Sequence, residues 1–93
     1  MYRLLIVDDE AYIVDWIYEL FGQNKELDLD IYKAYSGLEA LNLLSRAKVD
    51  IVLTDIRMPD MDGLQLLMKL KQHYSHVPVI IATAQGRPRE SLT

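Results

Sequence analysis

Acidic side chains stand where two apolar segments of this sequence end. Asp8 and Asp9 directly follow the apolar residues 4–7, and Asp55 comes just past Thr54, after the largely apolar segment 49–53. Short continuous apolar runs are typical of strands that are buried on both faces of a parallel sheet. A single acidic residue after a strand is more often a solvated turn residue than a ligand. It is the combination of positions that suggests chemistry.

Three carboxylates gathered in one place require a counter-charge. Unit charges about 4 Å apart repel by roughly 4 kcal/mol at an effective dielectric constant near 20. Mg²⁺ is suited to such a site because it takes one or two carboxylates, keeps several waters and leaves positions for phosphate oxygens. An aspartate can also act as a nucleophile that forms an aspartyl phosphate. We therefore expect phosphoryl-transfer chemistry, which depends mainly on positioning and on neutralised oxygens.

Four strands and three helices that alternate along the chain would position these residues. The strands are expected at residues 4–7, 29–34, 49–53 and 78–82. The first helix is expected to end at Gly22, the second to run from a capping box at Ser36 and Glu39 to about Ala47, and the third to begin at Asp62 and Gly63. Helical spacing predicts that their apolar faces pack in the core: Ile13, Trp16, Ile17, Leu20 and Phe21; Leu38, Leu41 and Leu44; Leu64, Leu67, Met68 and Leu70.

This alternation predicts an α/β three-layer sandwich around a parallel sheet with right-handed crossovers. We expect the strand order 2-1-3-4, in which the winding reverses between the first and third strands. A doubly wound sheet opens a crevice at that point, beyond the carboxyl ends of its strands. Asp8, Asp9, Asp55 and the hydroxyl residue Thr83, which follows the fourth strand, should therefore converge on one rim.

Composition narrows the classes of function. The chain has 93 residues, which suit one small domain, and a formal net charge of -4 with scattered basic residues, which disfavours direct nucleic-acid binding. The absence of cysteine excludes disulfides and leaves no thiolate ligands, so a zinc site is not expected. No apolar run approaches the roughly 20 residues of a membrane helix, and no signal peptide is recognisable, so we expect a cytoplasmic protein without a membrane contact.

Three segments resemble the signatures of the receiver-domain family of two-component response regulators, in that family's order and spacing. They are LLIVDDE, DIVLTDIRMPDMDG and VPVIIATA, which begin at Leu4, Asp50 and Val77. The resemblance implies a flavodoxin-like receiver fold and a regulatory domain that accepts a phosphoryl group from a histidine kinase. Such a domain is not an enzyme beyond its own phosphorylation and dephosphorylation.

The resemblance also implies a role for individual residues. Asp55 matches the phosphoacceptor, Asp9 a direct Mg²⁺ ligand and Asp8 a more indirect partner of the metal. Arg57 matches the position whose backbone carbonyl completes the coordination. Thr83 matches the hydroxyl that hydrogen-bonds the phosphoryl group.

The sequence departs from the family's pattern after the fourth predicted strand. Residues 1–86 are expected to form a partial receiver-like domain, and residues 87–93 an atypical tail. The family's last strand and last two helices, and the lysine that contacts the phosphoryl group, have no counterpart. The fourth strand should then be an exposed apolar edge, and the face that carries the first helix should lose its usual neighbour and expose apolar surface. We expect a homo-oligomer formed through one of these surfaces.

Two other functions remain open from the residues alone. A truncated receiver-like module could serve oligomerisation or interaction without phosphoryl signalling, as the missing lysine suggests. An Mg²⁺-dependent phosphohydrolase could use Asp55 as nucleophile, but such enzymes usually carry a second acid two positions later, where this chain has Arg57.

Overall fold

A parallel sheet forms the centre of the protein, and its strand order is the predicted one. The computed structural model describes residues 2–24, 26, 28–55 and 63–81. Within them the sheet has the order β2-β1-β3-β4, with every neighbouring pair parallel. The strands are β1 (Tyr2–Val7), β2 (Leu29–Ala34), β3 (Ile51–Thr54) and β4 (Val79–Ile81).

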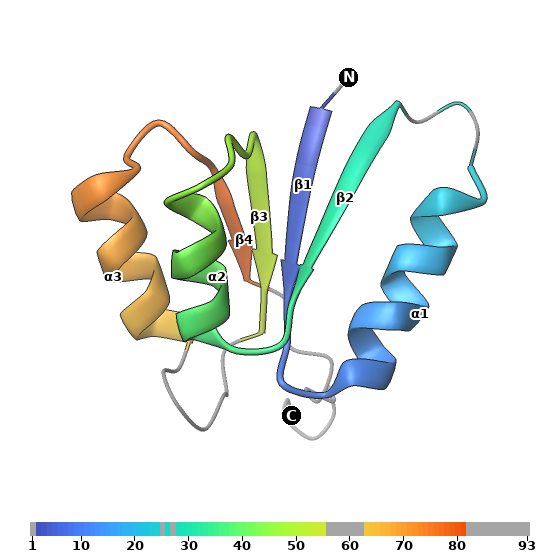
Figure 1. Cartoon of the computed structure of the whole chain (residues 1–93), viewed down its shortest axis with the longest axis horizontal. Helices are drawn as coiled ribbons and strands as arrows, with labels where there is room; N and C mark the ends of the chain where they lie inside the picture. Colours follow the sequence, from blue (N-terminus) through green and yellow to red (C-terminus); the bar gives the residue numbers. More distant parts are fainter. Residues whose placement is uncertain (1, 25, 27, 56–62, 82–93) are drawn as a thin grey trace, which may run out of the picture.

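Helices cover both faces of the sheet (Figure 1). Helix α1 (Ala11–Gly22) lies on one face, while α2 (Gly37–Leu44) and α3 (Gly63–His73) lie on the other. The predicted three-layer α/β sandwich is therefore confirmed. No helix in the described part of the chain is long and apolar enough to span a membrane.

The central strand β1 supplies side chains to two separate cores. Because successive side chains of a strand point to opposite faces, Leu4 and Ile6 pack with Val14 of α1, while Leu5 and Val7 join the core beneath α2 and α3. All four of these β1 residues are buried. This explains why the first apolar run is continuous rather than alternating.

The capping box predicted at the start of α2 is present. The Ser36 side chain accepts a hydrogen bond from the backbone N–H of Glu39 at 3.0 Å, and the Glu39 carboxylate accepts one from the backbone N–H of Tyr35 at 2.8 Å. Helix α2 ends at Leu44 rather than near Ala47. The chain continues there as turns, in which the N–H groups of Arg46 and Ala47 both donate to the Leu43 carbonyl.

The predicted apolar face of α1 is only partly buried. Trp16 is 61% exposed and Leu20 49% exposed, so the prediction that they pack in the core was wrong. The fully buried residue is Val14, and Ile17 and Phe21 pack around it. Since apolar residues surround more than one side of α1, spacing alone did not identify which stripe faces the sheet.

Some residues of α2 and α3 that were predicted to pack in the core are also exposed. Leu38, Leu64 and Met68 are exposed, whereas Leu66 and Leu70 are buried against the sheet. Leu66 was missing from the predicted face because it stands in a run of apolar residues. Such a run is compatible with more than one apolar helix face.

The contrast between two leucines of α3 gives a test of this packing. Leu66→Ala should lower the free energy of unfolding by about 2–5 kcal/mol, because it leaves a cavity in the core. Leu64→Ala, the matched control two residues away, should change it by less than about 0.5 kcal/mol. Urea unfolding followed by circular dichroism measures both. Equal losses in the two variants would contradict the observed orientation of α3.

Candidate metal and phosphoacceptor site

The strand register places the acidic residues side by side. Val7 of β1 pairs with Thr54 of β3, so Asp8 and Asp55 are the next residues along two adjacent parallel strands. Backbone hydrogen bonds continue one step past the strands: the Asp8 N–H donates to the Ala34 carbonyl at 3.2 Å, and the Asp55 N–H to the Val7 carbonyl at 3.0 Å. The sheet itself therefore fixes the backbone of both acids.

Three carboxylates meet at this edge of the sheet. Asp8, Asp9 and Asp55 each offer one oxygen, and these oxygens lie within 4.8 Å of one another. Asp8 and Asp55 are only 4% and 3% exposed, whereas Asp9 is exposed to solvent. The predicted convergence of the three acids is confirmed, and the donor set consists of the hard oxygens that Mg²⁺ prefers.

The environment of Asp8 opposes its negative charge. Burial, together with the neighbouring charge of Asp55 and contacts with Asp9, raises the pKa of Asp8 from 3.8 to about 6. The backbone N–H of Glu10 donates to Asp8 Oδ1 at 3.0 Å and lowers the pKa, but burial outweighs it. A cation placed among the three carboxylates would relieve this cost.

Thr54 is a polar residue of the site that the sequence did not single out. Its side chain is buried, and its hydroxyl donates to the backbone carbonyl of Asp55 at 3.0 Å. A hydroxyl at the last position of an otherwise apolar strand was the available signal. Thr54 helps to hold the backbone that carries Asp55.

Two of the predicted site residues cannot be placed. Arg57 and Thr83 lie outside the described residues, so the roles assigned to them stay predictions. The histidines His73 and His76 are exposed and lie at the end of α3 and in the turn after it.

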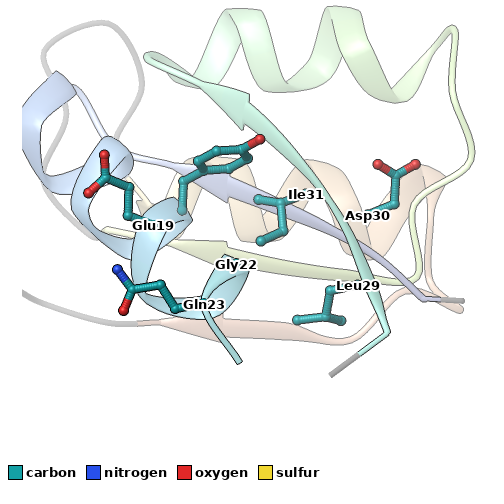
Figure 2. A pocket seen from close by; sticks show the side chains of 7 residues that line it. Glu19, Gly22, Gln23, Leu29, Asp30 and Ile31 are labelled. Atoms are coloured by element: carbon teal, nitrogen blue, oxygen red, sulfur yellow. The ribbon is translucent and has the colours of Figure 1, made fainter. Parts of the chain in front are cut away.

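The acidic site does not coincide with the more voluminous of two hollows among the described residues. A hollow of about 420 Å³ lies between the second half of α1 and the start of β2, at the opposite end of the strands (Figure 2). The hollow that includes Asp8, Thr54 and Asp55 has only about 20 Å³, roughly the space of one water molecule. Among the described residues, the space beside Asp8 and Asp55 is therefore of a size suited to an ion.

Known proteins resemble this chain in sequence. The profile of the response regulator receiver domain matches residues 4–92. Sporulation initiation phosphotransferase F of Bacillus subtilis is 38% identical over 84 residues, which are 90% of this chain and 65% of that protein. The DNA-binding transcriptional regulator NtrC of Klebsiella pneumoniae is 43% identical over 81 residues, 87% of this chain but 17% of that protein.

Solved structures agree with the sequence matches. The response regulator TrrA of Thermotoga maritima, solved in complex with Mg²⁺-BeF, has 30% identity and a TM-score of 0.83 over 99% of this chain and 77% of that one. A response regulator receiver domain protein of Clostridium thermocellum has 29% identity and a TM-score of 0.81, covering 89% and 65% of the two chains.

The chain spans less than two thirds of the length of several relatives, such as 18% of the transcriptional regulatory protein GlrR of Escherichia coli. The residues matched by the family profile, 4–92, include Asp8, Asp9 and Asp55. On the profile match, the sequence identities and the fold, this chain belongs to the response regulator receiver domain family.

Proposed function

We propose that this domain is the phosphoacceptor of a two-component signalling system and is phosphorylated on Asp55 in the presence of Mg²⁺. The observation that carries the proposal is the meeting of three carboxylate oxygens within 4.8 Å at the ends of β1 and β3. The Mg²⁺-BeF complex of the related TrrA supports the assignment of metal and phosphoryl analogue to this kind of site.

Each carboxylate has a distinct part in the proposed reaction. Bound Mg²⁺ would neutralise the oxygens of the transferred group. Asp9, the exposed carboxylate, would bind the ion directly, and the buried Asp8 would interact with it more indirectly. An Asp55 oxygen would form a bond to phosphorus as the bond from phosphorus to the donor breaks, and the donor atom would keep the electron pair. The Arg57 carbonyl and the Thr83 hydroxyl complete the proposed site.

The proposed phosphoryl donor is the phosphohistidine of a histidine kinase in the cytoplasm. A small phosphoryl donor would serve more slowly. The domain is then a regulated acceptor rather than an enzyme with a turned-over substrate, and any DNA binding or other output would belong to other domains. Residues 1–86 carry this proposed activity.

A second candidate function, self-association without signalling, is favoured by the exposed apolar side chains. Tyr12, Trp16 and Leu20 are 67%, 61% and 49% exposed at four-residue intervals, so they form one stripe along α1. Ile80 is 49% exposed on β4, one of the two edge strands of the described sheet. Apolar surface of this kind marks interaction sites.

Substitution of the acceptor tests the leading proposal. Acetyl phosphate with Mg²⁺ should add one phosphoryl group to the wild type, and Asp55→Asn should abolish the added mass because it removes the nucleophilic oxygen. Asp30→Asn is the control for the loss of one surface carboxylate. Intact-mass spectrometry gives the readout. Phosphorylation that persists in Asp55→Asn would remove Asp55 from the role.

The raised pKa of Asp8 predicts how the stability of the metal-free protein depends on pH. The folded state binds a proton at Asp8 more tightly than the unfolded chain does, so without Mg²⁺ this residue makes the fold more stable as the pH falls from 7 through about 6. Asp8→Asn should therefore raise the unfolding free energy at pH 7 by about 1–3 kcal/mol.

Mg²⁺ and the proton compete for the same carboxylate. Mg²⁺ affinity should fall as the pH drops through about 6, as titration calorimetry at several pH values can measure. An affinity that is constant between pH 5 and 7.5 would contradict the place of Asp8 beside the ion.

Self-association has its own test. Sedimentation velocity at tens of micromolar should show a dimer or larger species. Trp16→Lys should dissociate an assembly that uses the α1 stripe, whereas Ile80→Lys should dissociate one that uses the β4 edge. A wild-type monomer would contradict this candidate.

A further inference from the structure

A hydrogen-bonded cluster joins α1, β2 and α2 at the acidic end of the sheet. The Asp15 carboxylate of α1 accepts hydrogen bonds from Lys33 Nζ at 3.1 Å and from the Tyr35 hydroxyl at 3.2 Å. The backbone N–H of Tyr35 donates to the Glu39 carboxylate of α2 at 2.8 Å. One residue, Tyr35, therefore contacts both of the helices that flank β2.

This cluster is connected to the carboxylates through very short stretches of backbone. Ala34, which directly precedes Tyr35, accepts the backbone hydrogen bond of Asp8. Helix α1 begins at Ala11, two residues after Asp9, and Asp15 lies on its second turn. A displacement of the start of α1 would move Asp9.

The start of α1 has no side-chain cap, and its local support includes the hydrogen bond from the backbone N–H of Glu10 to Asp8 Oδ1 at 3.0 Å. Glu10 occupies the N-cap position, but its side chain makes no capping hydrogen bond. Elsewhere in the described chain, α2 has a side-chain cap from Ser36. Without a cap, the position of the first turn depends more strongly on tertiary contacts such as the one between Asp15 and Tyr35.

We propose that Tyr35 is a positioning residue of the Mg²⁺ site, acting through Asp15 to fix the start of α1 and with it Asp9. The inference rests on the proposed function, because it assumes that the three carboxylates hold the ion. Residues that orient metal ligands from outside the coordination sphere influence metal affinity.

The hydroxyl of Tyr35 can be removed without removing its packing. Its ring is half-buried and packs against the core between the sheet and α1, so phenylalanine retains that contact. Lys33 keeps Asp15 paired in the variant, since it bonds the same carboxylate oxygen and also lies 4.4 Å above the centre of the Tyr18 ring. We therefore expect a moderate effect on the ion.

The experiment measures the Mg²⁺ dissociation constant by titration calorimetry and the unfolding free energy by urea. Tyr35→Phe should weaken Mg²⁺ binding about threefold, the size expected for one hydrogen bond. In an Asp15→Ala background the same substitution should have no further effect on binding. Tyr18→Phe, the matched control, keeps the ring beneath Lys33 and should bind Mg²⁺ as the wild type does.

The outcomes separate this inference from the proposed function. If Asp9→Asn and Asp55→Asn weaken Mg²⁺ binding while Tyr35→Phe lowers only stability, the positioning role is wrong and the proposed function stands. An equal loss from Tyr35→Phe with and without Asp15 would also overturn the positioning role. If the wild type fails to bind Mg²⁺, or binds it equally well after Asp9→Asn and Asp55→Asn, both fail.

Discussion

Electrostatic repulsion among Asp8, Asp9 and Asp55 is the constraint around which this structure is built. Two of these carboxylates are buried, and the pKa of Asp8 is raised to about 6 as a result. Such an arrangement costs stability in the absence of a cation. In the proposed function, a divalent ion would offset this repulsion and would in turn attract the phosphoryl group.

The sheet imposes this proximity through its backbone. Parallel pairing of β1 with both β2 and β3 brings three carboxyl ends of strands together, and the hydrogen bonds of Asp8 and Asp55 extend that pairing into the site. Buried β1 side chains on both faces keep the central strand in register. The helices contribute at the ends, where the contact between Asp15 and Tyr35 joins α1 to β2. Packing and chemistry therefore depend on the same few residues at the edge of the sheet.

The strand order and the acidic convergence could be predicted because they follow from general rules. Alternating strands and helices limit the topology, and acids at the ends of neighbouring parallel strands must meet. Burial of individual helix residues could not be predicted in the same way: Trp16 is exposed and Leu66 is buried, since both helices carry apolar residues on more than one side. The contacts of Tyr35 were also inaccessible, because they join residues 20 positions apart through side-chain geometry.

Paramagnetic Mn²⁺ in place of Mg²⁺ tests the central claim most directly. At a small fraction of one equivalent, it should broaden the backbone amide signals of Asp8, Asp9 and Asp55 in ¹H–¹⁵N spectra before any others. The signals of Leu29 and Ile31, which border the large hollow at the opposite end of the sheet, should remain sharp. Uniform broadening, or broadening centred on that hollow, would show that the three carboxylates do not form the cation site.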